Sequence, residues 1–189
     1  MSTLWLVRHG PTHARAVTGW RDIPADLTDS AALARLSAAL PDAPVVSSDL
    51  IRAVATADAI AGTRERLPHE RDLREMDFGD WDGLTYQEIS ARDPALSRSF
   101  WTDPAMAAPP GGEGWEGFRS RVLLATQRLV AAHGELVVVA HFGTILALVQ
   151  EATGETPAAV MGRPVTPLSL TEISLTPSYW NLRRMNVLS

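Results

Sequence analysis

The chain has 189 residues, of which 46% are hydrophobic and 21% charged, and its formal net charge is −5. This composition indicates a globular protein with a sizeable core, and the acidic balance argues against nucleic-acid binding, which usually needs a broad basic face. All 17 basic residues are arginine and cysteine is absent. Lysine Schiff bases, P-loop lysines, disulfides, thiolate metal sites and cysteine nucleophiles are therefore excluded.

No stretch of the sequence is typical of a membrane span or a secretory signal. The longest apolar run, Leu136–Val149, contains His141 and Gly143 and is too short to cross a bilayer. The N-terminus leads directly into a strand-like segment without a basic region before it. We therefore expect a cytoplasmic protein that binds neither membrane nor nucleic acid.

Hydrophobic periodicity predicts strands and helices that alternate along the chain. The expected strands cover Leu4–Val7, Pro44–Ser47, Arg66–His69 and Leu136–Ala140, followed by a hairpin of Leu168–Leu175 and Tyr179–Met185 across Thr176-Pro177-Ser178. The first expected helix has its N-cap at Thr28 and carries Leu33, Leu36 and Leu40, and the second runs from a cap at Ser48 or Asp49 to about Ala61, where Gly62 ends it. A third helical region covers Leu84–Trp101 with an interruption near Pro94. The fourth helix has Trp115, Phe118, Val122, Ala125 and Leu129 on one face, and the fifth covers Thr144–Ala152. Alternation of this kind predicts one layered α/β domain over residues 1–189.

Between two of these helices lies a segment rich in Pro, Gly and Ala. This segment, Thr102–Gly114, is predicted to be a loop and is long enough to form a wall over a pocket.

Two histidines follow directly on buried strands that are far apart in the sequence. His9 stands in Leu6-Val7-Arg8-His9-Gly10, and His141 stands in Val138-Val139-Ala140-His141. Open α/β sheets bind ligands at the carboxyl ends of their strands, so both imidazoles are expected at one edge of the sheet. Arginine matches phosphate geometry and histidine can attack phosphorus, so this pair with Arg8 predicts a phosphoryl-transfer site.

Two further segments add a cation and an acid to this prediction. Ser47–Ala57 changes from strand to helix and places Arg52 in the first helical turn, where free N–H groups already favour an anion. Leu73–Gly83 contains Glu75 and three aspartates, which are Asp77, Asp80 and Asp82. The aspartates fit no EF-hand spacing, so we interpret them as a solvated loop and expect no metal site.

Taken together, the motifs resemble the histidine phosphatase superfamily, also called the phosphoglycerate-mutase-like family. The resemblance rests on Arg8-His9-Gly10 with Thr12, the Ser47–Ala57 segment, Leu73-Arg74-Glu75 with Phe78-Gly79 and Trp81-Asp82-Gly83, Pro109-Pro110-Gly111-Gly112-Glu113, and His141. It implies a three-layer α/β/α sandwich with a mostly parallel central sheet. It also implies a nucleophile at His9, phosphate binding by Arg8 and Arg52, a second pocket histidine at His141, and an acid at Glu75.

Three positions depart from the family pattern. Pro11 stands where many members have an acidic residue, and Arg15 stands where many have an asparagine that contacts phosphate. Phe142 replaces a small residue after the second histidine, so its side chain is expected to narrow the pocket while its backbone N–H stays available. Thr12 and Trp20 complete the expected substrate contacts. We interpret Trp81, Trp101, Trp115 and Trp180 as ordinary packing, and His13, His69 and His133 as surface residues.

The activity implied is a phosphomonoester phosphatase of the small phosphatase branch, acting on a small phosphorylated metabolite such as a sugar phosphate or α-ribazole phosphate. Neutral His9 would form a phosphohistidine, Arg8, Arg52 and His141 would hold the phosphate oxygens, and Glu75 would protonate the leaving alkoxide. No cofactor is expected, since arginines supply the positive charge.

Three other readings stay open. A cofactor-dependent phosphoglycerate mutase would use the same residues but would need a water-excluding pocket and more basic residues. A non-catalytic phosphate or phosphohistidine binding module would need neither His9 as nucleophile nor Glu75 as acid. A protein-phosphohistidine phosphatase would make Glu75 superfluous, because its imidazole leaving group needs less protonation. A homodimer through an exposed strand or helix fits the sequence, although no residue pattern establishes it.

Overall fold

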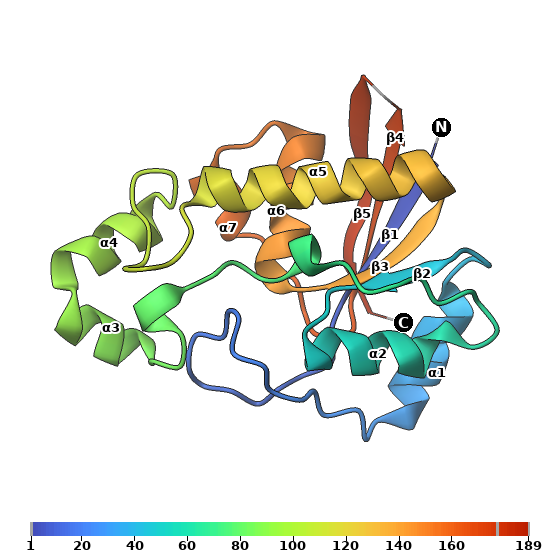
Figure 1. The fold of residues 1–189 in the computed structure, drawn as a ribbon, viewed down its shortest axis with the longest axis horizontal. Coiled ribbons are helices and arrows are strands. Elements are labelled where there is room, and N and C mark those ends of the chain that lie inside the picture. Colours follow the sequence, from blue (N-terminus) through green and yellow to red (C-terminus); the bar gives the residue numbers. More distant parts are fainter. Residues whose placement is uncertain (1, 177, 189) are drawn as a thin grey trace.

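A five-stranded sheet with helices on both faces organises the computed structural model, which describes residues 2–176 and 178–188 (Figure 1). The strands are β1 (Ser2–Arg8), β2 (Val45–Ser47), β3 (Leu136–Ala140), β4 (Leu170–Thr176) and β5 (Tyr179–Val187). The helices are α1 (Ser30–Ala39), α2 (Ile51–Ala61), α3 (Tyr86–Arg92), α4 (Pro94–Thr102), α5 (Trp115–His133), α6 (Phe142–Thr153) and α7 (Pro157–Met161), with 3₁₀ turns η1 (Arg71–Leu73) and η2 (Gly79–Trp81).

The strand order is β2-β3-β1-β4-β5. β1 and β2 each pair parallel with β3, whereas β4 pairs antiparallel with both β1 and β5. Four strands therefore point the same way and β4 opposes them. The expected mostly parallel sheet is confirmed, and the closing β4–β5 hairpin forms as predicted; Pro177 in its turn lies outside the described residues.

Alternation along the central strands separates two apolar cores, one on each face of the sheet. Leu4 and Leu6 of β1 join the larger core with residues of α5 and α6, and Val7 joins the smaller core with residues of α1 and α2. Figure 1 shows α5, α6 and α7 on one side of the sheet and α1 and α2 on the other. This is the three-layer α/β/α arrangement that the resemblance implied.

The helix starts differ from the predictions in two places. Asp29, and not Thr28, caps α1, and its carboxylate accepts from the N–H of Ala32 at 2.9 Å. α2 has Leu50 at its N-cap without a side-chain cap, because a more distant carboxylate replaces it. Asp22 accepts from the N–H of Ile51 at 2.7 Å, so the cap comes from the loop after β1 and could not be read from local sequence.

Two other expectations concern the segment between α2 and α5. Arg66–His69 forms no strand, and only an isolated bridge joins Arg66 to Val45. The helical region breaks before Pro94, which begins α4, because proline favours the first helical turn. Thr102–Gly114 connects α4 to α5 with no named helix or strand after Thr102, as predicted. In Figure 1, α3 and α4 lie together to the left, away from the sheet.

Within residues 2–176 and 178–188, no helix has the length and apolarity to cross a membrane.

Candidate active site

The two histidines meet where β1 and β3 end. Arg8 is in register with Ala140, and the N–H of His9 donates to the carbonyl of Ala140 at 3.0 Å. The imidazole rings of His9 and His141 lie 5.2 Å apart between centroids, tilted by 59°. Parallel pairing of two strands far apart in sequence thus creates the juxtaposition that the motifs predicted.

His9 is held as a neutral imidazole with one defined tautomer. Its ring is buried, and Nδ1 lies 2.7 Å from the carbonyl oxygen of Gly10. A carbonyl can only accept, so Nδ1 carries the hydrogen and Nε2 carries the lone pair. Burial first, and then the nearby charge of Arg52, lower the pKa of His9 to about 3. Nε2 of His9 is therefore an available nucleophile at neutral pH.

Two arginines place positive charge beside His9 without a carboxylate bonded to either. Arg52 is only 1% exposed, and its guanidinium donates to the carbonyls of Gly19 at 2.7 Å and Arg21 at 2.9 Å. Nη1 of Arg8 donates to the carbonyl of Val165 at 2.5 Å. Among the described residues neither arginine forms an ion pair, and the Nε of each is buried without a partner. Such oriented guanidinium groups with unpartnered N–H donors favour a bound anion.

Arg52 is not the surface arginine that a local pairing with Asp49 would give. Asp49 instead forms a two-point ion pair with Arg74, at 2.6 and 2.7 Å. Arg52 therefore remains directed to the loop after β1 and to the cavity beside it.

Glu75 is a buried carboxyl group whose geometry is defined by two backbone donors. Its side chain is 7% exposed and accepts from the N–H of Gly143 at 3.0 Å and of Met76 at 2.9 Å. Burial raises the pKa of Glu75, although both hydrogen bonds and the charges of Arg52 and Arg8 act in the opposite direction. A carboxyl group with a raised pKa can serve as a proton donor.

Gly143 was not singled out by the sequence reasoning, yet the site requires a glycine there. A Cβ at this position would lie 2.4 Å from Oε1 of Glu75 and 3.3 Å from the ring of Phe118. A side chain at this position would force the Glu75 carboxyl group to shift, so glycine allows the first turn of α6 to donate to Glu75 in the observed geometry.

The backbone at Glu75 is held by residues that the sequence reasoning also missed. Arg121 of α5 donates to the carbonyls of Asp72, Arg74 and Glu75 at 2.8 to 3.0 Å, and Glu113 binds the same guanidinium at 2.7 Å. Glu113 appeared in the family motif, but no local signal linked Arg121 to it. Through these contacts of Arg121, α5 and the end of the 102–114 loop hold the backbone of Glu75 in place.

Trp20 supports Glu75 and does not line the cavity. Its indole Nε1 donates to the carbonyl of Glu75 at 2.8 Å, and the guanidinium groups of Arg71, Arg74 and Arg121 lie 5.0 to 5.8 Å from its ring. The aspartates expected in a solvated loop also have structural partners. Asp82 accepts from the N–H groups of Gly19 and Arg21, and Asp80 pairs with Arg92.

His141 is completely buried beside His9, and neither of its ring nitrogens has a hydrogen-bond partner among the described residues. Burial, with Arg52 next, holds its pKa well below the usual value, so the ring is neutral. A neutral imidazole still carries one N–H donor. Buried donors are normally satisfied, so this one is a candidate contact for a bound anion.

A cavity of about 320 Å³ joins these groups. Its lining combines the charged residues with an apolar set: Arg8, His9, Thr12, Ala14, Ala16, Val17, Thr18, Arg52, Glu75, Phe78, Tyr86, Trp101, Phe142 and Met161. Thr12 and Phe142 line it as expected from the sequence. Trp101, interpreted as packing, also lines it, whereas Trp20 and His141 are not among the lining residues. Arg15 is exposed and outside the lining.

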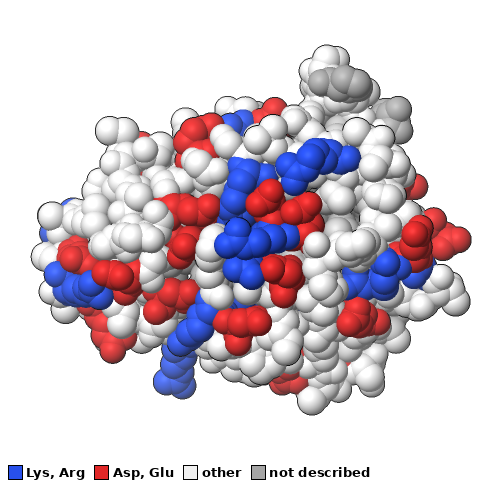
Figure 2. All heavy atoms as spheres, viewed as in Figure 1, with Lys and Arg blue, Asp and Glu red and all other residues white. Residues whose placement is uncertain are grey.

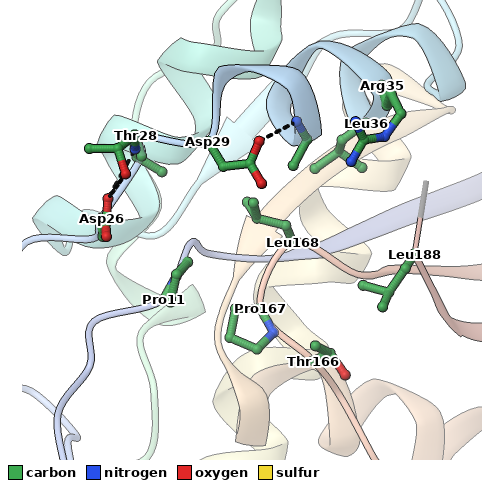
Figure 3. Close-up of a pocket in the computed structure, with 12 residues that line it drawn as sticks. Pro11, Asp26, Thr28, Asp29, Arg35, Leu36, Thr166, Pro167, Leu168 and Leu188 are labelled. Carbon is green, nitrogen blue, oxygen red and sulfur yellow. Dashed lines mark hydrogen bonds between the residues drawn. The ribbon is translucent and has the colours of Figure 1, made fainter.

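A second cavity, of about 430 Å³, lies between the N-terminal end of α1 and the 166–168 segment before β4 (Figure 3). Pro11 and Leu168 face into it, with Asp29 at its rim engaged in capping α1. Neither histidine lines this cavity, so size alone does not identify the chemical site.

The described part of the chain contains no group of three or more His, Asp or Glu side chains arranged to hold a metal ion. On the face drawn in Figure 2, acidic and basic side chains alternate and do not form one basic field. Among the residues that line the cavity, the two permanently charged cations are Arg8 and Arg52.

Two histidines, the buried Arg52 and the half-buried Arg8 meet at one edge of an α/β sheet, an arrangement that suits the binding of a phosphate group. Residues 4–188 match the sequence model of the histidine phosphatase superfamily, branch 1. Glucosyl-3-phosphoglycerate phosphatase of Mycolicibacterium vanbaalenii is 35% identical over 179 residues, covering 86% of this chain and 75% of the relative. Adenosylcobalamin/alpha-ribazole phosphatase of Salmonella typhimurium is 32% identical over 155 residues, covering 77% of each chain.

The fold agrees with this relationship. The solved structure of YhfR from Bacillus stearothermophilus superposes with a TM-score of 0.90 at 29% identity, covering 100% of this chain and 98% of that one. The chain belongs to the histidine phosphatase superfamily and is an enzyme of that family. The resemblance stated from the motifs is thereby confirmed.

Proposed function

We propose that this enzyme hydrolyses the phosphomonoester of a small metabolite through a phosphohistidine at His9. The observation that carries the proposal is the hydrogen bond from Nδ1 of His9 to Gly10, which leaves Nε2 unprotonated beside Arg8 and Arg52. Two curated relatives carry the names of small-metabolite phosphatases, which supports this substrate class. We keep a cytoplasmic location and a homodimer as expectations.

The first step forms one bond and breaks another at phosphorus. Nε2 of His9 attacks the phosphorus, and the phosphorus–oxygen ester bond breaks. Glu75 gives its proton to the departing alkoxide and becomes a carboxylate. Arg8, Arg52 and the N–H of His141 hold the phosphate oxygens and offset their charge in the transition state.

The second step restores the enzyme. The Glu75 carboxylate takes a proton from water as the water oxygen attacks the phosphohistidine, and the phosphorus–nitrogen bond breaks. Inorganic phosphate leaves, and Glu75 is protonated again. The backbone donors at Gly143 and Met76 keep the carboxyl oriented in both roles.

Phosphate release from a panel of phosphomonoesters, measured in the presence of EDTA, tests the proposal. We expect turnover of alkyl and aryl esters that EDTA leaves unchanged, because the arginines supply the positive charge. Transfer of the phosphoryl group to a second acceptor without net phosphate release would favour a mutase. Absence of release from every ester, p-nitrophenyl phosphate included, would overturn the proposal.

Replacement of Gly143 tests the placement of Glu75. In Gly143→Ala the added Cβ occupies the position of the Glu75 carboxylate, so we expect kcat/KM on glycerol phosphate to fall about 10²-fold, the typical cost of a misplacement near 1 Å. Gly117→Ala is the matched control, because a Cβ there meets nothing within 4 Å. Equal activity of the two variants, with circular dichroism showing both folded, would contradict the assigned contact.

A further inference from the structure

The cavity beside His9 has a charged, buried part and an apolar, more exposed part. Arg52, His9 and Glu75 are each at most 7% exposed, whereas Tyr86 is 58% exposed. The apolar lining comes from separate parts of the chain, and its larger side chains are Val17, Phe78, Tyr86, Trp101, Phe142 and Met161. The phosphate is therefore expected in the buried part, and the group esterified to it against the apolar lining.

Trp101 is held in place by an aromatic cluster on α3, α4 and η2. Its ring lies 4.7 Å from Phe100, 4.8 Å from Tyr86 and 6.5 Å from Trp81, with the Trp81 ring nearly parallel at 23°. Trp81 and Phe100 are completely buried, so they fix the position of Trp101. The result is a rigid aromatic surface that reaches the cavity.

Two features of this surface are incomplete without a ligand. The indole Nε1 of Trp101 is buried and has no hydrogen-bond partner among the described residues, although buried indole N–H groups usually have one. Tyr86 lines the cavity and is 58% exposed, which is unusual for a large aromatic residue without a partner to cover it. A bound ring would cover the apolar surface that Trp101 and Tyr86 present to the cavity.

The lining also argues against a charged leaving group. Its described basic side chains are Arg8, Arg52 and the neutral His9, and both arginines are needed for the phosphate. A carboxylate on the leaving group would lose water without gaining a cation, which is unfavourable. The volume of about 320 Å³ is at the small end of ligand cavities, which suits one compact ring system beside the phosphate.

We propose that the natural substrate is the phosphomonoester of an uncharged, planar aromatic or heteroaromatic alcohol, whose ring lies against Trp101 and Tyr86. This inference rests on the proposed phosphatase function. The inference predicts that esters with an aromatic leaving group are preferred over esters whose leaving group carries a carboxylate. The proposed function alone predicts no such preference.

The test compares kcat/KM for four esters: benzyl phosphate, cyclohexylmethyl phosphate, glycerol phosphate and 3-phosphoglycerate. All four have alkoxide leaving groups, so the difficulty of breaking the ester bond is similar and binding decides the order. We expect benzyl phosphate to exceed 3-phosphoglycerate by at least about tenfold and to exceed its saturated analogue by about 2- to 10-fold.

Variants of Trp101 and Tyr86 test whether these two residues cause the preference for benzyl phosphate. In Trp101→Leu we expect the ratio of kcat/KM for benzyl phosphate over glycerol phosphate to fall about 5-fold or more. Tyr86→Leu, at an exposed position that tolerates substitution, should lower the same ratio and serves if Trp101→Leu does not fold. Tyr179→Leu is the control, since Tyr179 is 63% exposed on the β4–β5 hairpin and outside the cavity.

The outcomes separate this inference from the function on which it rests. Hydrolysis of 3-phosphoglycerate or glycerol phosphate as efficiently as benzyl phosphate would overturn the aromatic substrate and leave the phosphatase intact. An aromatic preference that survives both cavity variants would overturn the assignment to Trp101 and Tyr86. Absence of hydrolysis of every ester would overturn both proposals.

Discussion

His9→Ala is expected to abolish phosphate release from every ester, with a loss of about 10⁴-fold or more in kcat/KM. In the proposal His141 contacts the phosphate oxygens through its N–H and does not attack phosphorus, and His13, between the lining residues Thr12 and Ala14, is exposed and pairs with Asp26. No cysteine or lysine exists in the chain to take over the covalent role. In His9→Ala the two arginines would still bind the phosphate group of the ester, but no nucleophile would accept the phosphoryl group.

The measurement pairs steady-state turnover with trapping of the intermediate. Rapid quench with a ³²P-labelled ester should label wild-type protein in an acid-labile, alkali-stable form, as expected for a phosphorus–nitrogen bond, and should not label His9→Ala. His133→Ala is the matched control, because His133 is exposed at the end of α5. Turnover by His9→Ala within tenfold of wild type would contradict the covalent mechanism.

Glu75→Gln is expected to lower kcat/KM on alkyl phosphates by about 10²–10⁴-fold, the usual contribution of a placed proton donor. The first turnover of p-nitrophenyl phosphate should fall much less, because that leaving group departs without a proton. The neutral amide keeps the size of the carboxyl group but has a single oxygen, so it can replace only one of the two acceptors, because Gly143 donates to Oε2 and Met76 to Oε1 of Glu75. Loss of the other hydrogen bond would affect alkyl and aryl esters alike. The difference between esters therefore reports proton transfer and not loss of folding.

The control for Glu75→Gln is the same substitution at a carboxylate that is remote from the cavity. Glu116→Gln serves, since the Glu116 side chain is 73% exposed and pairs with Arg119 on α5. An equal loss on alkyl and aryl esters in Glu75→Gln would show that the residue organises the cavity without donating a proton.

Glu75→Gln also tests which group causes the fall of kcat/KM at high pH. The proposed mechanism needs His9 neutral, hence a pH above its pKa of about 3, and Glu75 protonated, hence a pH below its raised pKa. Wild-type kcat/KM should therefore rise through pH 3 and fall once Glu75 ionises. Ionisation of the substrate is common to both enzymes, so the wild-type to Glu75→Gln ratio isolates the falling limb; a constant ratio would contradict the assignment.

The sequence by itself determined the five strands of the sheet, and it predicted the edge where β1 and β3 end and most of the residues of the proposed reaction. β-branched runs before His9 and His141 identify buried strands, and parallel strands expose their carboxyl ends at one edge. Arg52 was located because a strand-to-helix change is a local signal with an anion-binding end. The family resemblance, and with it the role expected of Glu75, rests on short motifs that occur in a fixed order. Each such motif consists of residues next to one another in the sequence, so it can be found without a structure.

The tertiary structure alone decided how these groups are supported and what surrounds the phosphate. Gly143 donates to Glu75, Arg121 and Trp20 hold its carbonyl, and Asp22 caps α2; each of these contacts joins segments far apart in the chain. Trp101 was interpreted as ordinary packing because packing is the more common role of a tryptophan that no motif marks as a ligand contact. Local periodicity reports which face of an element is apolar, but not which other element meets it, and that meeting places Trp101 at the cavity beside His9.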